Sequence, residues 1–277
     1  MLATEIITSR RNPLVAKLRA LHQAKGRREQ GLILLEGTHL LQECGRLQLK
    51  LQLICATTAW GQRHPDLLQL APCQPVSPEV LAAMASTESP DGVVALLAAP
   101  KDETELAELD LAPRPLLLGL DRVQDPGNMG TILRTALAAG VDQVWLGAGA
   151  DPWQPKVLRA SAGASLQLAM RRYPNLEAGL ALALNSGLQV LAAVQQGGKP
   201  YWAVDWQLPS LLLLGNEGSG LAANLLEGVQ LVTIPHGNRV ESLNVAVAAG
   251  LLLMERNRQK LMAGHGRGES SIAEPHP

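Results

Sequence analysis

Asn128 and Arg134 are the first residues in the chain whose types and spacing suggest chemistry. They stand six positions apart in "DRVQDPGNMGTILRTALAAG", residues 121–140, where an apolar run leads into a glycine-containing loop and then a helical pattern. In α/β proteins ligands bind outside the carboxyl ends of parallel strands, so both side chains could meet one polar ligand there. From these residues alone, a helix-capping Asn and a surface Arg would be the simpler explanation.

The glycines of this loop do not fit a phosphate-binding motif. A dinucleotide fingerprint needs G-x-G-x-x-G directly after the strand, but here residues 121–126 precede Gly127 and the third glycine is missing. A P-loop needs Lys after its last glycine, and Thr131 follows Gly130. Neither of these two phosphate-binding motifs therefore fits the loop.

Two later segments repeat the arrangement of an apolar strand followed by a polar loop. In "LLLLGNEGSGL", residues 211–221, three glycines would let a ligand lie against bare backbone, and Glu217 follows the strand at the same sheet edge. In "VTIPHGNRVESLNVAVAAGLLLMER", residues 232–256, Ser242 is predicted to cap the long helix that follows. Small residues in that helix, such as Ala246 and Gly250, would let another backbone pack closely.

The elements that must position these loops alternate regularly from residue 116 onward. Near-continuous apolar runs alternate with helical patterns, which is typical of a mostly parallel sheet covered on both faces in an α/β fold. Gly140 is predicted to end the helix that carries Arg134. The predicted strands span residues 116–120, 143–147, 166–170, 188–194, 211–215 and 229–235.

Residues 1–98 are predicted to form a separate, small α/β domain. Residues 12–31 carry apolar positions at helical spacing with basic residues on the other face, and strand and helix patterns follow. Residues 99–115 contain five acids and three prolines and are predicted to be a linker. The second domain then spans residues 116–262, and the small, polar residues 263–277 are predicted to form a flexible tail.

Charge and composition narrow the class of protein. The net charge of −1 argues against a uniformly basic nucleic-acid binder, but residues 1–30 hold seven Lys or Arg against two Glu, an excess that could bind phosphates. A solvated helix face would be the simpler explanation of that excess alone.

The three cysteines are widely spaced, so we expect free thiols and predict no metal site. No signal peptide is evident and the longest apolar stretch, residues 243–254, is too short to span a bilayer, which favours a cytoplasmic protein with no membrane partner.

Three segments, in this order, resemble the signature of the SpoU/TrmH family of RNA 2′-O-ribose methyltransferases, within the SPOUT superfamily. They are "DPGNMGTILRTALAAG", "LLLGNEGSGL" and "IPHGNRVESLNVAVAAG", and "PKVLRASAGAS", residues 155–165, is similar to a further family segment. The N-terminal residues resemble the L30e-like substrate-binding domain of many members. Members often carry Met where this chain has His236, which is expected to be a satisfied loop histidine.

The resemblance implies a fold and a set of site residues. It implies a C-terminal trefoil knot in the catalytic domain, which periodicity could not show. It also implies S-adenosylmethionine (SAM) as the cofactor, bound in the knot largely by backbone groups at Gly215, Asn216, Gly220, Ile234 and Leu243. The family's polar active-site positions match Asn128, Arg134, Glu217, Ser242 and Asn244.

Arg134 is expected to have the main catalytic role. The family proposal makes this Arg a general base, but a guanidinium stays protonated in proteins. We expect Arg134 to hold phosphate and to stabilise a developing alkoxide, while the proton leaves through phosphate or water. Asn128 and Glu217 would position either Arg134 or the ribose.

The resemblance also suggests partners. Members with the additional N-terminal domain more often act on large-subunit (23S) ribosomal RNA than on tRNA, and the basic cluster would contact structured RNA through its phosphates and shape. Its residues are Arg10, Arg11, Lys17, Lys25, Arg27 and Arg28. A homodimer through the knot domain is expected. The alternatives are a tRNA 2′-O-methyltransferase, a catalytically silent RNA-binding or ribosome-assembly protein, and a nucleotide-dependent oxidoreductase.

Overall fold

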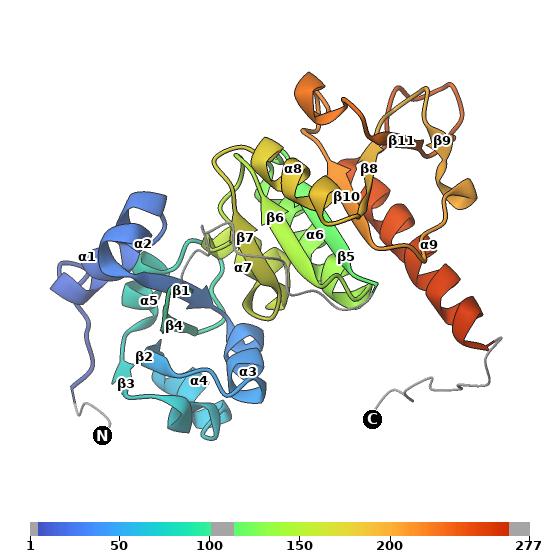
Figure 1. The fold of residues 1–277 in the computed structure, drawn as a ribbon. Helices are drawn as coiled ribbons and strands as arrows, with labels where there is room; N and C mark the ends of the chain where they lie inside the picture. The colour runs from blue at the N-terminus through green and yellow to red at the C-terminus, as the bar shows by residue number, and fades with distance from the viewer. Residues whose placement is uncertain (1–4, 101–113, 266–277) are drawn as a thin grey trace. The chain divides into compact units, whose positions relative to one another are not determined.

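The computed structural model describes residues 5–100 and 114–265 (Figure 1). Contacts between residues divide the described chain into two compact units. The first unit holds the residues up to 100 together with Asp125–Arg134 and Ala150–Gln167, and the second holds 114–124, Thr135–Gly149 and the residues from Leu168 onward. Most of the predicted linker and most of the predicted tail lie outside the described residues.

The first unit contains a four-stranded mixed sheet. Its strands are β1 (Leu32–Glu36), β2 (Leu51–Ala56), β3 (Cys73–Pro75) and β4 (Val93–Ala98), in the order β1-β4-β2-β3. β4 pairs antiparallel with both β1 and β2, whereas β2 and β3 are parallel. Successive residues of β1 enter different clusters, Leu34 in one and Leu35 in the other, so the sheet is covered on both faces.

Helices cover the two faces of this sheet. α1 (Pro13–Ala20) and α5 (Pro78–Met84) pack with one cluster, and α3 (Thr38–Arg46) and α4 (Thr58–Arg63) with the other. The helix expected over residues 12–31 is two helices, since α1 ends before α2 (Ala24–Gln30) begins. A Cβ at Gly26 would lie 2.0 Å from the Ala20 carbonyl oxygen, so the end of α1 and the start of α2 approach too closely for any larger residue.

The second unit contains a seven-stranded sheet in which all neighbouring strands are parallel. The order is β7-β6-β5-β10-β8-β11-β9, so β5 and β10 are central. The strands are β5 (Leu116–Leu120), β6 (Gln143–Leu146), β7 (Ala169–Arg172), β8 (Gln189–Ala193), β9 (Lys199–Pro200), β10 (Ser210–Leu214) and β11 (Gln230–Thr233). The prediction of a mostly parallel sheet is confirmed, whereas the knot stays a prediction.

Two of the strands differ from those predicted. The strand expected over residues 166–170 is β7, which starts at Ala169 because Ala164–Leu166 forms a 3-10 turn (η2) after α7 (Pro155–Ala160). β9 was not predicted because it has only two residues, which give no periodic pattern.

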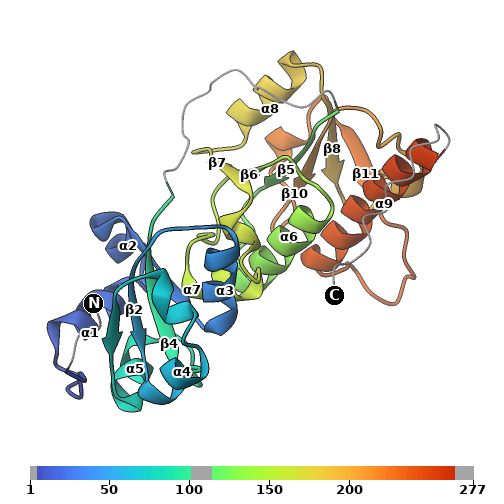
Figure 2. The same ribbon diagram turned by 90° about the horizontal axis from the view of Figure 1, so that it is seen from below.

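Helices lie on both faces of the parallel sheet. α8 (Glu177–Asn185) and the 3-10 turn η4 (Ala223–Leu225) pack on the face that includes Leu211 and Leu213. Leu214, whose side chain has the opposite direction, lies in a cavity with residues of α9 (Val245–His265). Figure 2 shows α9 running beside β8 and β11. α6 (Pro126–Ala138) follows β5, and Gly140 after it has a φ of +70°, as its predicted role as a helix stop requires.

Candidate active site

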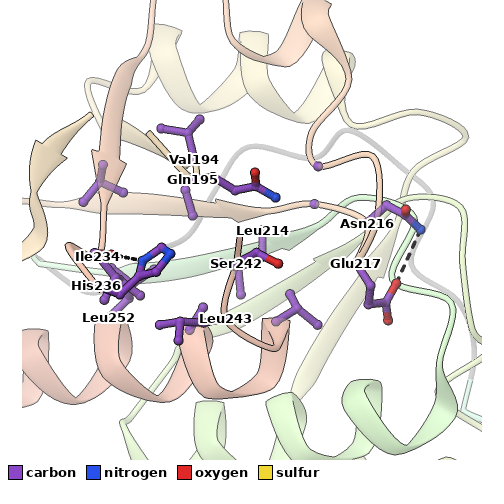
Figure 3. A pocket seen from close by; sticks show the side chains of 16 residues that line it. Val194, Gln195, Leu214, Asn216, Glu217, Ile234, His236, Ser242, Leu243 and Leu252 are labelled. Atoms are coloured by element: carbon purple, nitrogen blue, oxygen red, sulfur yellow. Dashed lines mark hydrogen bonds between the residues drawn. The ribbon is translucent and has the colours of Figure 1, made fainter. Parts of the chain in front are cut away.

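A cavity lies where three strands of the parallel sheet end (Figure 3). It encloses ≈ 660 Å³ of space not occupied by atoms, part of which is open to solvent. Its walls come from the ends of β8, β10 and β11, from the loops that follow β10 and β11, and from the first turns of α9. They include all five residues predicted to bind the cofactor: Gly215, Asn216, Gly220, Ile234 and Leu243.

The loop after β10 is shaped by Asn216. The Asn216 side-chain oxygen accepts hydrogen bonds from the backbone N–H groups of Gly218 (3.0 Å) and Ser219 (2.9 Å). Backbone hydrogen bonds join residues 216 and 220 in both directions, at 3.1 and 3.0 Å. A Cβ at Gly215 would lie 2.3 Å from the backbone of Gly220 and Leu221, so the tight loop excludes any larger residue at that position.

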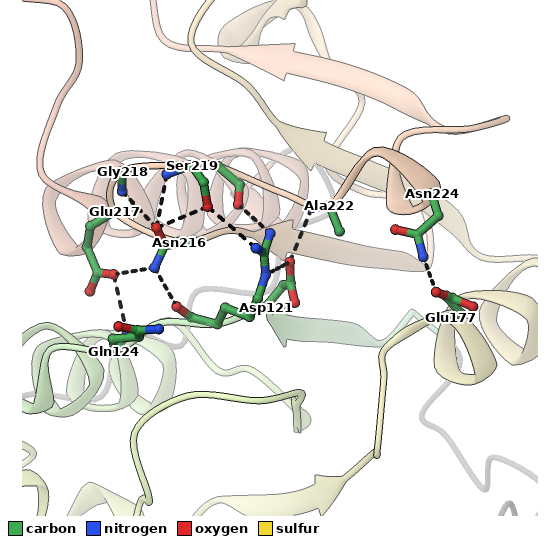
Figure 4. A network of polar contacts seen from close by, with 11 residues as sticks. Asp121, Gln124, Glu177, Asn216, Glu217, Gly218, Ser219, Ala222 and Asn224 are labelled. Carbon is green, nitrogen blue, oxygen red and sulfur yellow. Dashed lines mark hydrogen bonds and ion pairs between the residues drawn. The ribbon is translucent and has the colours of Figure 1, made fainter.

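A second network fixes this loop to the segment after β5 (Figure 4). The buried Asp121 carboxylate (residue 7% exposed) accepts hydrogen bonds from the Arg122 Nε (3.1 Å) and from the Ala222 backbone N–H (3.2 Å). The Arg122 guanidinium also donates to the Gly220 carbonyl oxygen (3.2 Å), and the Asn216 amide donates to the Arg122 carbonyl oxygen (2.9 Å). Asp121 and Arg122 were not predicted as site residues, although an acid directly after a buried strand was a usable signal.

The Glu217 carboxylate lies at the edge of the cavity. Its Oε2 accepts hydrogen bonds from the Gln124 backbone N–H (3.3 Å) and from the Asn216 amide (3.4 Å). Gln124 directly precedes the segment that carries Asn128 and Arg134 in the sequence. This hydrogen bond therefore links the second sequence segment to the residue directly before the first.

The N-terminus of α9 differs from the prediction. Ser242 lines the cavity, but the residue that caps the helix is Asn244. The Asn244 side-chain oxygen accepts hydrogen bonds from the backbone N–H groups of Ala246 (2.8 Å) and Val247 (3.3 Å). The prediction that Ser242 caps α9 is wrong because the helix begins at Val245, which places Asn244 in the capping position.

Asn128 and Arg134 lie on α6, in the part of that helix that belongs to the first unit. The Asp125 carboxylate accepts a hydrogen bond from the Asn128 backbone N–H (2.8 Å), and Asn128 lies in the first turn of the helix. The sequence had placed Asn128 in the loop before the helix, and this prediction is wrong. Arg134 is exposed. A Cβ at Gly130 would lie 2.8 Å from the Ser161 backbone nitrogen, so α6 packs very closely against the segment after α7.

Five of the six predicted RNA-binding cations are exposed on the first unit: Arg10, Arg11, Lys17, Lys25 and Arg28. Arg27 is buried, at 4% exposed, and donates to the Asp151 carboxylate (2.5 Å) and to the Leu21 carbonyl oxygen (2.8 Å). The prediction that Arg27 binds RNA is therefore wrong, because a buried and paired guanidinium cannot reach a phosphate.

None of the three cysteines is among the residues that line this cavity. Cys44, Cys55 and Cys73 are free and buried, and burial raises the pKa of the Cys44 thiol to about 11 and that of Cys55 to about 12. Within residues 5–100 and 114–265, no three His, Cys, Asp or Glu side chains gather as a metal site would require. In the same residues, no helix is long and apolar enough to cross a membrane.

Comparisons with known proteins identify both parts of the chain. Residues 115–254 match the model of the SpoU rRNA Methylase family, and residues 12–95 match that of the MRM3-like substrate binding domain. The predicted family and its N-terminal substrate-binding domain are thus confirmed.

Individual relatives agree over nearly the full length. The chain is 46% identical to an uncharacterized tRNA/rRNA methyltransferase of Synechocystis, with 93% of this chain and 95% of the relative covered. It is 35% identical to the 23S rRNA (guanosine(2553)-2′-O)-methyltransferase RlmP of Bacillus subtilis, with 89% of this chain and 97% of the relative covered. The crystal structure of an AdoMet-bound rRNA methyltransferase from Sinorhizobium meliloti superposes with a TM-score of 0.80 at 30% identity, covering 92% and 97%. The chain belongs to the SpoU rRNA methylase family.

Proposed function

We propose that this protein transfers the methyl group of SAM to a ribose 2′-hydroxyl of ribosomal RNA, most specifically of the large-subunit (23S) RNA. The observation that carries the proposal is the cavity at the ends of β8, β10 and β11, which gathers the predicted cofactor-binding positions of two separate sequence segments. The name of the B. subtilis relative supports both the 2′-O position and the 23S substrate. The cytoplasmic location expected from the sequence is part of this proposal.

The residues of the cavity fit SAM. Leu214, Val232 and Leu252 offer an apolar wall for a flat adenine, and the backbone groups of Gly215, Ile234 and Leu243 can contact its edge. Asn216 and Glu217 provide polar groups at one end, suited to the charged methionyl part of the cofactor. When bound, SAM supplies an electrophilic methyl group on its sulfonium.

The chain's own residues would orient the ribose and help to remove its proton. Arg134 would hold an RNA phosphate and stabilise the alkoxide that develops at the 2′-oxygen. Asn128, in the same helix, would position the ribose or Arg134. The Glu217 carboxylate accepts a hydrogen bond from the Gln124 backbone N–H, directly before this segment, and would help to position the ribose. A proton on the 2′-hydroxyl would leave through phosphate or water.

The N-terminal residues are the proposed RNA-binding domain. Its boundaries follow the sequence prediction, with residues 1–98 as the substrate-binding domain, 99–115 as the linker and 116–262 as the methyltransferase domain. The five exposed cations would contact phosphates of a folded RNA, where charge and shape contribute more than sequence.

The same proposal includes a homodimer that packs through α9. Val247, Leu251 and Met254 are exposed large apolar side chains, at 53%, 39% and 41%, and their spacing of four and three residues places them on one face of the helix. With Tyr201 and Gly250 they line a shallow hollow. A second copy of this chain is the occupant that we propose, since closed two-fold dimers are the commonest assemblies.

The experiment that tests the function maps 2′-O-methyl groups on RNA from wild-type and deletion strains of the source organism. One 23S ribosomal nucleotide should lose its methyl group on deletion and regain it with purified protein and SAM. Loss of a tRNA methyl group instead would contradict the ribosomal substrate. If RNA binds while labelled SAM transfers no methyl group, the protein is catalytically silent; tight binding of NAD in place of SAM would favour the oxidoreductase.

A further inference from the structure

His236 lies in the cavity with a defined hydrogen-bonding state. Its Nδ1 is 2.8 Å from the Ile234 carbonyl oxygen. A carbonyl oxygen can only accept, so Nδ1 carries the hydrogen of this bond. In the neutral imidazole the other nitrogen, Nε2, then has a lone pair and can only accept a hydrogen bond.

The surroundings of His236 differ from those of Glu217. Figure 3 shows Ile234, His236 and Leu252 gathered at one end of the cavity and Asn216 and Glu217 at the other. The His236 end is therefore bounded mainly by aliphatic side chains, together with the one imidazole. A flat, largely apolar ring with a hydrogen-bond donor on its edge fits this end better than a charged amino acid does.

We propose that Nε2 of His236 accepts a hydrogen bond from the 6-amino group of the cofactor's adenine, so that this side chain selects for a 6-amino purine. The inference rests on the proposed function, which places SAM in this cavity. A 6-oxo purine would present a second acceptor to Nε2 and would be rejected, because two acceptors leave a buried polar pair without a hydrogen.

The test measures binding of S-adenosylhomocysteine and its 6-oxo analogue, S-inosylhomocysteine, by calorimetry. Wild-type protein should prefer the 6-amino compound roughly 10- to 100-fold. His236→Met removes the acceptor and should reduce the preference about tenfold. His236→Gln places an amide at this position, which can turn either its oxygen or its NH2 group toward the ring edge, so this variant should bind the 6-amino compound and still lose most of the preference.

A matched control uses the exposed His39 of the first unit, where His39→Gln should leave the preference unchanged. If wild-type protein binds neither compound, the proposed function fails, and this inference with it. If it binds S-adenosylhomocysteine and His236→Met keeps the full preference, only the inference is overturned. Should the Met variant unfold early in a thermal melt, the Gln variant decides, since a full preference for the 6-amino compound in that variant contradicts the proposal.

Discussion

At the scale of single residues, Arg134 and Arg27 illustrate two different uses of a guanidinium in this chain. Arg134 is exposed on α6, whereas Arg27 is buried against Asp151. An exposed cation can meet a phosphate or a developing negative charge on a ligand. A buried guanidinium already donates its hydrogen bonds within the protein. Substitution of Arg134 should therefore lower activity, whereas substitution of Arg27 should lower the stability of the fold.

Replacing Arg134 by Ala should abolish catalysis while leaving the cofactor site intact. We expect methyl transfer to fall by about 10³-fold, because stabilisation of the developing alkoxide is lost. The affinity for S-adenosylhomocysteine should change by less than about threefold, since the lining of the cavity is unchanged. Arg134→Lys keeps the charge but not the planar fork and should recover only part of the rate. Near-normal turnover in the Ala variant would refute the assignment.

The neighbours Arg27 and Arg28 allow a matched comparison. Arg28→Ala should weaken RNA binding a few-fold and lower the salt dependence of the binding constant by about one phosphate contact, with an unchanged melting temperature. Arg27→Ala should remove the buried ion pair with Asp151 and the hydrogen bond to the Leu21 carbonyl oxygen, and so destabilise the fold by up to about 3 kcal/mol. Filter binding at several salt concentrations and a thermal melt measure the two effects. Equal loss of RNA affinity with equal stability in both variants would contradict this division.

At the scale of elements, the loops after β5 and β10 behave as one structure. Asp121 and Arg122 follow β5, and their hydrogen bonds end on backbone groups of the loop after β10. Arg122 has a φ of +54°, a left-handed conformation that side-chain-bearing residues rarely adopt. The hydrogen bonds of its side chain and its carbonyl oxygen hold this conformation in place.

Removing the Arg122 side chain should loosen the loop after β10, which holds three of the proposed cofactor-binding residues. We expect Arg122→Ala to raise the KM for SAM about tenfold, with a much smaller effect on kcat, because the change affects the proposed cofactor contacts and not the residues on α6. Arg122→Gly removes the same side chain and also relieves the left-handed backbone, so it should be better folded than the Ala variant. Steady-state kinetics and melting temperatures measure both; an unchanged KM in both variants would rule out this role.

The second half of α9 has a pH-dependent contact. Hydrogen bonds from Arg258 and then Gln259 hold the pKa of the Glu255 carboxyl below its ordinary value. A lowered pKa in the folded state stabilises the fold above the ordinary pKa of 4.5, and this stability is lost as the pH falls through the folded value. Glu255→Gln should therefore cost under about 1 kcal/mol at neutral pH, because Arg258 is more than half exposed.

Urea unfolding of both proteins at about pH 7 and about pH 4 measures this difference. The gap in unfolding free energy between the wild-type protein and the Glu255→Gln variant should narrow at the lower pH. A gap that widens on acidification would mean that the carboxylate is not stabilised by this ion pair.

A helix or strand could be predicted where the residues that cause it are close together in the sequence. Strands such as β5 and β10 were predicted because every residue in them is buried and nearly all are apolar, which local sequence records directly. The break between α1 and α2 depends on the close contact of Gly26 with Ala20, and the pairing of Arg27 depends on Asp151, far along the chain. No local pattern distinguishes a cation that meets solvent from one that meets such a distant partner.

The site was predictable to a similar degree. Gly215, Ile234 and Leu243 were placed by the resemblance and do line one cavity. The capping residue of α9 was misassigned because both Ser242 and Asn244 are good caps, and only the start of the helix decides between them. The contact of the Arg122 guanidinium with the Gly220 carbonyl oxygen was missed because it is made with a backbone atom, which side-chain patterns do not reveal.

At the scale of the whole molecule, the exposed face of α9 makes a prediction about assembly. Substituting Leu251 and Met254 by Glu places two charges on the apolar face and should convert a dimer into a monomer. Light scattering after size-exclusion chromatography measures the mass, and a circular-dichroism spectrum checks that the fold is kept. Lys260→Glu, elsewhere on the same helix, serves as a control for added charge. A wild-type protein that is monomeric at high concentration would contradict the proposed homodimer.

The order of strands in the parallel sheet also bears on how the chain is made. β5 can pair with β6 soon after both leave the ribosome, but its other neighbour is β10, which is synthesised only after β7, β8 and β9. β8 likewise has no partner until β10 or β11 exists. The centre of the sheet therefore closes late in translation, and until residues 210–214 emerge, one edge of β5 has unpaired backbone groups that could bind another nascent chain or a chaperone.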